Sequence, residues 1–201
     1  MDNPIKIGIT GGIGSGKSYV ATIFSSLGVP MYNSDLRSRD LSNQSPIKEN
    51  IIKTFGDGFY YDGQLDRKKI AKIVFNDTEL LDKLNQIIHP VIESDFNAWC
   101  RLIKAIEPDT KFILKESAIL IETGMYKKMD FNILVTAPEE LRIQRVIKRD
   151  NLSVDAIKKR INKQSKDINK ILSVDYIINN DERTPVFDQV KIIYEQLSKR
   201  V

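Results

Sequence analysis

The chain has 201 residues, of which 41% are hydrophobic and 29% are charged, a composition typical of a globular protein that buries a real core. The formal net charge of +4 is too small to indicate a nucleic-acid partner, and a single cysteine, Cys100, excludes an intramolecular disulfide and multi-cysteine zinc sites. No segment approaches the roughly 20 apolar residues of a membrane span, and the first residues lack a secretory leader pattern, so we expect a cytoplasmic monomer or small homo-oligomer without a membrane partner.

The first predicted elements are a strand, a glycine-rich loop and a helix. The β-branched residues of Ile5 to Ile9 predict the strand, and apolar residues at helical spacing predict a helix over Lys17 to Leu27, which Gly28 is placed to end. A second short strand, Val29 to Tyr32, leads to Asp35. Open α/β sheets bind ligands at the carboxyl ends of strands, which favours a functional role for Asp35; the alternative is a helix N-cap.

From about residue 40 to 108 the apolar pattern is mostly helical, interrupted by a turn-rich stretch over 56–63, and this indicates an inserted helical subdomain. The later predicted elements are strands at Phe112 to Leu114, Phe131 to Val135 and Tyr176 to Ile178, and a last helix over Pro185 to Lys199. Because strands alternate with helices, we expect a parallel sheet that is covered on both faces.

The glycine-rich segment Gly11-Gly12-Ile13-Gly14-Ser15-Gly16-Lys17-Ser18 satisfies the Walker A pattern of a phosphate-binding loop. Its backbone N–H groups and the start of the following helix would cradle phosphates, Lys17 would reach the β- and γ-phosphates, and Ser18 would ligate Mg²⁺. The expected ATP contacts are Gly12, Ile13, Gly14, Ser15, Gly16, Lys17, Ser18 and Tyr19. A flexible Gly-Ser turn is the alternative, but it needs no lysine at a helix start.

Positive charge is concentrated between Arg142 and Lys170, where ten Lys or Arg stand against three Asp, a net of 10 − 3 = +7. Arg145 and Arg149 are four residues apart, so on a helix they share a face and could point at the same phosphates. A solvated surface helix is the alternative.

We expect a P-loop nucleoside triphosphate hydrolase-like three-layer α/β fold. Its predicted parts are a core over about 1–39, 109–140 and 171–201, an acceptor-binding insert over about 40–108 and a basic lid over about 141–170.

A Walker A loop does not name the reaction. A GTPase would need an Asn-Lys-x-Asp segment, which the chain lacks, and a motor or helicase usually needs a larger domain. A kinase needs a carboxylate to accept the proton of the acceptor hydroxyl, and Asp35 fits that role. Two alternatives remain: another metabolite or nucleoside-phosphate kinase, and a non-catalytic ATP-responsive switch.

The run from Gly8 to Ser18, followed by Asn33-Ser34-Asp35, resembles the opening of dephospho-coenzyme A kinases. The other segments that resemble this family are Asp62 to Arg67 with Val74-Phe75, His89-Pro90, Arg145, Arg149-Asp150, Arg160 to Gln164, and Asp175 to Asn180. The resemblance spans nearly the whole chain.

The resemblance implies transfer of the γ-phosphoryl group of Mg-ATP to the ribose 3′-hydroxyl of dephospho-coenzyme A. The catalytic residues it implies are Asp35 as base, Lys17, Arg145 and Arg149, with Asn180 on the nucleotide and Asp35, Arg67, His89 and Glu122 on the acceptor side. On the residues alone, Arg67 could instead form a surface ion pair with Asp66, and His89 before Pro90 is expected as a structural turn residue.

The chain also departs from the family pattern. The departures are Asn33 for an aspartate, Ala118 for a proline, Arg142 for a glutamine and Asp181 for a glycine. We expect the last two to alter the loops on the adenine side.

Overall fold

The computed structural model describes residues 4–74, 77–163 and 170–200, and the chain divides into two compact units. The first unit is formed by Met1–Tyr32 with Ile103–Val201, and the second by Asn33–Leu102. Phe75 and Gln164, which belong to family-like segments, and residues 165–169 of the expected basic lid lie outside the described residues.

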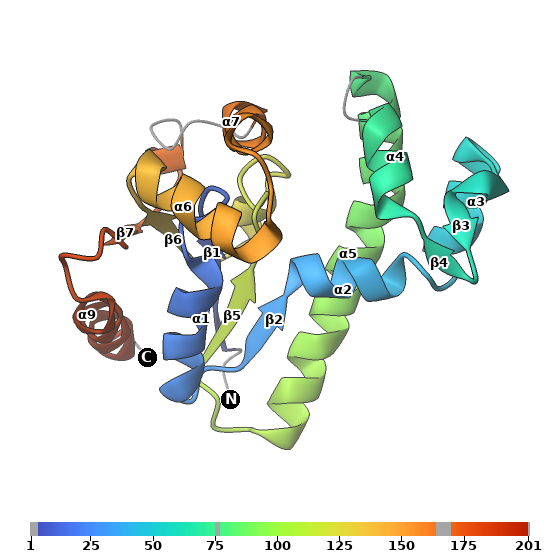
Figure 1. Cartoon of the computed structure of the whole chain (residues 1–201). Helices are drawn as coiled ribbons and strands as arrows, with labels where there is room; N and C mark the ends of the chain where they lie inside the picture. The colour runs from blue at the N-terminus through green and yellow to red at the C-terminus, as the bar shows by residue number, and fades with distance from the viewer. Residues whose placement is uncertain (1–3, 75–76, 164–169, 201) are drawn as a thin grey trace. The chain divides into compact units, whose positions relative to one another are not determined.

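A five-stranded sheet in the order β2-β5-β1-β6-β7 forms the centre of the first unit (Figure 1). The strands are β1 (Ile5–Thr10), β2 (Met31–Asn33), β5 (Phe112–Glu116), β6 (Phe131–Thr136) and β7 (Tyr176–Asn179). The ladders that join β1 to β5, β1 to β6 and β6 to β7 are all parallel, which confirms the predicted parallel sheet. Because β1 is the central strand, the phosphate loop that follows its carboxyl end lies at the centre of that edge of the sheet.

The helices of the first unit follow the predicted order. They are α1 (Lys17–Ser26), α6 (Glu139–Asp150), α7 (Val154–Lys163) and α9 (Val186–Ser198), with a short 3₁₀ helix η2 at Met125–Lys128. Helix α1 packs on β1 and β5 and against α9. Buried residues recur along α9 at helical spacing, Val186, Val190, Ile193 and Leu197, and they join Ile7 and Ile9 of β1 in one core. This core fixes the start of α1 relative to the strand that precedes the loop.

The second unit is mainly helical. Its elements are α2 (Ser34–Leu41), α3 (Ile47–Phe55), the 3₁₀ helix η1 (Asp57–Phe59), β3 (Tyr60–Tyr61), β4 (Gln64–Leu65), α4 (Arg67–Val74) and most of α5 (Thr78–Ile106). A small core of Ile47, Ile51, Ile70, Val74 and Leu84 holds them together. The stretch expected only as a turn-rich interruption contains a hairpin, β3–β4, whose turn residues Asp62 and Gly63 both have positive φ.

The predicted turn at His89-Pro90 is wrong, because both residues lie inside helix α5. Proline removes one backbone hydrogen bond of a helix, but buried Ile92 and Phe96 follow it at helical spacing. Packing of this apolar face therefore outweighs the local cost of the proline. No helix in the described ranges has the length and apolar composition needed to cross a membrane.

Candidate active site

The phosphate loop connects β1 to α1 and adopts the backbone that its glycines permit. Gly14 and Gly16 have φ values of +78° and +92°, in the left-handed region that favours glycine. Gly16 is also the N-cap of α1, and a Cβ on it would clash with the side-chain amide of Asn180. That amide donates a hydrogen bond of 2.8 Å to the carbonyl oxygen of Ser15. A carbonyl held from outside cannot turn toward an anion in the loop, which favours binding of phosphate by the loop N–H groups.

Ser18 lies next to a carboxylate that sequence reasoning missed. Its Oγ donates a hydrogen bond of 2.7 Å to Oε1 of Glu116, which is 3% exposed at the carboxyl end of β5. The parallel register pairs Glu116 with Ile9 of β1, directly before the loop. A carboxylate that ends a buried strand beside the Walker A strand is the signal in the sequence that could have identified it.

The chemistry of this pair suits magnesium. Mg²⁺ prefers oxygen ligands, is usually held by one or two carboxylates with substrate phosphates, and keeps several waters. The Ser18 hydroxyl and the Glu116 carboxylate supply such a pair beside Lys17, the first residue of α1. Among the described residues no group of three or more His, Cys, Asp or Glu could hold a metal by itself, so an ion here would also depend on ligands from the nucleotide.

A cavity of about 580 Å³ opens beside the loop. Four residues expected on the nucleotide side line it, Gly16, Tyr19, Arg145 and Asn180, together with residues 182–186 of the segment between β7 and α9. The same segment contains Asp181, which accepts backbone hydrogen bonds from Arg183 and Thr184 at 3.0 and 2.8 Å. These hydrogen bonds lower the pKa of its carboxyl group. Asp181 therefore shapes the turn that forms one wall of the cavity.

The two expected lid arginines, Arg145 and Arg149, do not bind the same group in the structure. Nη2 of Arg145 donates to the carbonyl oxygen of Asn180 at 3.1 Å and to Glu182 at 2.9 Å. The Arg149 side chain is 64% exposed and forms two hydrogen bonds, of 2.7 and 2.9 Å, with its neighbour Asp150. The hydrogen bond to Asp150 raises the pKa of Arg149. Arg145 thus belongs to the cavity, whereas Arg149 is held by an adjacent carboxylate.

Glu122 lies in an ion pair. Its Oε1 is 2.9 Å from Nζ of Lys170, a lysine whose side chain is fully buried. The pair joins the segment after β5 to the end of the basic stretch. Arg142, which was expected to affect the adenine side, lies instead against the phosphate loop, where its Nε donates to the carbonyl oxygen of Ile13 at 2.9 Å.

In the second unit, Asp35 lies in the first turn of α2 but does not cap it. Asn33 is the N-cap, and its Oδ1 accepts a hydrogen bond of 2.9 Å from the N–H of Leu36, so the N-cap alternative for Asp35 is wrong. Two further hydrogen bonds, of 2.9 and 2.6 Å, join Arg37 of α2 to Asp95 of α5. This fork fixes the orientation of α2, because bidentate arginine-carboxylate pairs constrain both partners.

Asp35 has positive neighbours within the second unit. The pKa of Arg67 is lowered by burial and by the charge of Arg39, and raised by the charge of Asp35. Asn43, which follows α2, ties β4 to this helix: its Oδ1 accepts from the N–H of Leu65 at 2.8 Å, and its Nδ2 donates to the carbonyl oxygen of Arg39 at 3.2 Å. Strand β4 leads into Arg67 at the start of α4. Asp66, the partner considered for Arg67, accepts a hydrogen bond from the N–H of Lys69 at 2.9 Å.

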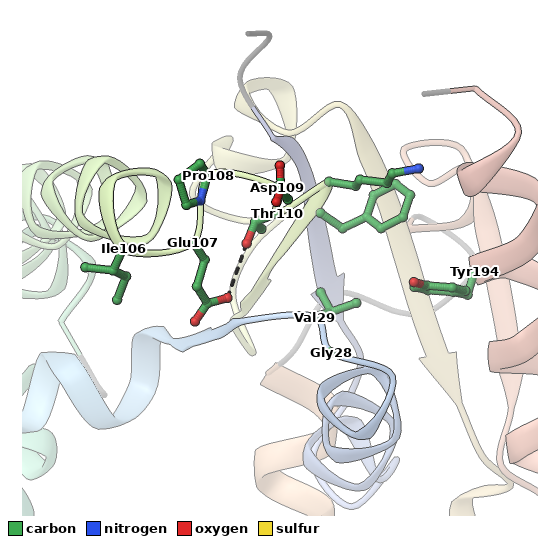
Figure 2. Close-up of a pocket in the computed structure, with 10 residues that line it drawn as sticks. Gly28, Val29, Ile106, Glu107, Pro108, Asp109, Thr110 and Tyr194 are labelled. Carbon is green, nitrogen blue, oxygen red and sulfur yellow. Dashed lines mark hydrogen bonds between the residues drawn. The ribbon is translucent and has the colours of Figure 1, made fainter.

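A different cavity, of about 500 Å³, lies at the opposite edge of the sheet in the first unit (Figure 2). Its lining includes Gly28, Val29, Tyr194 and residues 106–112, and Thr110 donates a hydrogen bond to Glu107 at 3.2 Å. None of the residues expected to bind ATP or the acceptor lines it. The cavity beside the phosphate loop is therefore the candidate nucleotide site.

Comparison with known proteins identifies the family. A family model described as dephospho-CoA kinase matches residues 5–185, which is most of the chain. The chain belongs to the dephospho-coenzyme A kinase family. It is 39% identical to the dephospho-CoA kinase of Aquifex aeolicus over 199 residues, covering 96% of this chain and 98% of that one. It is 36% identical to the Bacteroides fragilis dephospho-CoA kinase over 187 residues, covering 92% and 89%.

Solved structures agree with this family assignment. The dephospho-CoA kinase from Campylobacter jejuni superimposes with a TM-score of 0.67 at 26% identity, covering 98% of each chain. The shikimate kinase from Acinetobacter baumannii, at 15% identity and a TM-score of 0.54 over 98% of this chain and 94% of that one, shares the fold alone. The family, the P-loop fold class and the kinase activity predicted from the sequence are confirmed.

Proposed function

We propose that the chain transfers the γ-phosphoryl group of Mg-ATP to the ribose 3′-hydroxyl of dephospho-coenzyme A and releases coenzyme A and ADP. The observation that carries the proposal is the 2.7 Å contact of Ser18 with Glu116 beside a Walker A loop, in a chain of this family. A loop that only bound an anion would not need a buried carboxylate next to it, since that carboxylate repels phosphate. A cation between them resolves the repulsion.

On the donor side, the loop N–H groups bind the phosphates, and Lys17 and Arg145 offset their negative charge. Ser18 and Glu116 would hold Mg²⁺, which would supply positive charge to neutralise the charge that develops during transfer. Residues Gly12 to Tyr19 and Asn180 form the rest of the proposed nucleotide site. Arg149, which is held by Asp150, is proposed to reach the phosphates only if it exchanges this partner for them.

On the acceptor side, Asp35 accepts the proton of the 3′-hydroxyl as its oxygen forms a bond to the γ-phosphorus, and the bond from that phosphorus to the ADP oxygen breaks. Arg67, with Arg39 nearby, would attract the diphosphate of the acceptor. His89 is proposed to support the acceptor site as part of α5. Glu122, paired with Lys170, is proposed to fix the segment that follows β5.

The finer properties stay predictions. The chain is proposed to be cytoplasmic, to act as a monomer or small homo-oligomer and to have no nucleic-acid or membrane partner. The small net charge of +4 and the single cysteine support this proposal.

An acceptor panel tests the proposed function. Purified protein is supplied with Mg-ATP and, separately, dephospho-coenzyme A, pantetheine, nucleosides and nucleoside monophosphates, and ADP release is measured. We expect release with dephospho-coenzyme A and none with Lys17→Ala, because the lysine charge at the phosphates is lost. If another acceptor gives faster ADP release, that compound and not dephospho-coenzyme A is the substrate. If no acceptor stimulates ADP release, the protein is an ATP-responsive switch and not a kinase.

A further inference from the structure

Arg142 occupies an unusual position for a charged residue. It is 7% exposed, and it lies on α6 directly behind the phosphate loop. In Figure 1, α6 passes over the end of β1 that leads into this loop. Its Nε donates a hydrogen bond of 2.9 Å to the carbonyl oxygen of Ile13. A buried guanidinium of this kind is retained only where acceptors satisfy it, and here an acceptor belongs to the loop itself.

Glycines at positions 12 and 14 of the loop leave the space that Arg142 occupies. A Cβ on Gly12 would clash with the guanidinium of Arg142, and a Cβ on Gly14 would lie 2.9 Å from the Cα of Arg142. The side chain and backbone of Arg142 thus fill the space behind the loop. Since both contacts are with the backbone of the loop, displacement of Arg142 would free the loop to adopt other conformations.

Two carbonyl oxygens of the loop are held from outside in this way. Arg142 binds that of Ile13, and Asn180 binds that of Ser15 at 2.8 Å. Arg145, one turn after Arg142 on α6, donates to the carbonyl oxygen of Asn180 at 3.1 Å. Helix α6 therefore supports the loop at both points. Alternate carbonyls fixed outward favour the inward N–H arrangement that binds a diphosphate.

We propose that Arg142 is a positioning residue that holds the phosphate loop in its diphosphate-binding conformation before the nucleotide arrives. Arginine provides a charge-assisted hydrogen bond, which is stronger than a neutral one. The inference rests on the proposed function only in that the loop binds a nucleotide, and it is independent of the acceptor.

Nucleotide binding without any acceptor tests this role, so its outcome is separate from that of the acceptor panel. Dissociation constants for ATP, ADP and adenosine are measured for the wild type, Arg142→Met and Arg142→Gln. In Arg142→Met, binding of ATP and ADP is expected to weaken by about 10-fold or more, the range for loss of a hydrogen bond to a charged group. Adenosine, which lacks the phosphates, should bind as in the wild type. Arg142→Gln should weaken ADP binding by a smaller factor of about threefold, because it keeps a neutral donor.

The control is Lys191→Met, which removes a positive charge from an exposed position on α9 and should leave all three constants unchanged. Unchanged ADP binding in Arg142→Met would overturn the proposal, and so would an equal loss for adenosine, which would indicate general structural damage. If Arg142→Met does not fold, Arg142→Gln decides: weaker ADP binding with normal adenosine binding supports the proposal, and unchanged ADP binding overturns it.

Discussion

Glu116 and Ser18 form the contact on which the proposed chemistry depends. A carboxylate that is 3% exposed would be costly without a partner, and the Ser18 hydroxyl at 2.7 Å provides one. A hydroxyl that is already oriented by a carboxylate presents its oxygen lone pairs in a defined direction. The pair is therefore suited to hold Mg²⁺ against the nucleotide phosphates.

Glu116→Gln tests this role. Glutamine keeps the size and can still accept from Ser18, but it removes the negative charge that attracts the cation. We expect the Mg²⁺ concentration for half-maximal activity at saturating ATP to rise by about 10-fold or more. Initial rates across a magnesium titration measure it, with Glu195→Gln on the exposed face of α9 as the control for loss of an acid. An unchanged magnesium curve would remove Glu116 from the metal site.

At the level of single residues, the sequence located the phosphate loop but not its carboxylate. The loop is a local pattern in which spacing alone carries the information. Glu116 was missed because its importance depends on the parallel register that pairs it with Ile9, a contact between residues far apart in the chain. The predicted strand also ended at Leu114, whereas β5 continues to Glu116 itself.

The strands and the last helix of the first unit were predictable because their apolar patterns are clear. Strand β5 begins with three consecutive apolar residues, Phe112 to Leu114, and α9 has a buried stripe at helical spacing. The second unit was harder to predict. Its β3–β4 hairpin has strands of two residues each, too short for a periodic signal, and α5 continues through Pro90 because tertiary packing outweighs a local rule.

The ion pair of Lys170 with Glu122 connects two distant segments and should contribute to stability. The Lys170 side chain is fully buried, so Glu122→Gln would leave a buried ammonium without its counter-ion. Loss of one partner of a buried pair costs about 3–5 kcal/mol, and we expect the free energy of unfolding to fall by about that amount. Urea denaturation measures it.

The matched control is the exposed pair of Lys191 with Glu195, which are 3.9 Å apart on α9. Glu195→Gln should lower the free energy of unfolding by less than about 1 kcal/mol, because solvent screens the exposed pair. Equal effects of Glu122→Gln and Glu195→Gln would show that the buried pair has no special role in stability.

At the scale of the whole molecule, the chain divides its groups between two units. The phosphate loop, Glu116 and Arg145 belong to the first unit, and Asp35, Arg39 and Arg67 to the second. The sequence pattern predicted a core that extended to about residue 39, so it placed Asp35 and Arg39 with the phosphate loop rather than in the second unit.

The most direct measurement is the position of the transferred phosphoryl group. Dephospho-coenzyme A and Mg-ATP are incubated with wild type and with Asp35→Asn, and the product is analysed by ³¹P NMR. We expect a new 3′-phosphomonoester with the wild type. With Asp35→Asn the rate should fall by about 10²–10⁴-fold, while ATP still raises the melting temperature as in the wild type. A phosphoryl group at another position, or undiminished transfer by Asp35→Asn, would contradict the proposed reaction or its proton acceptor.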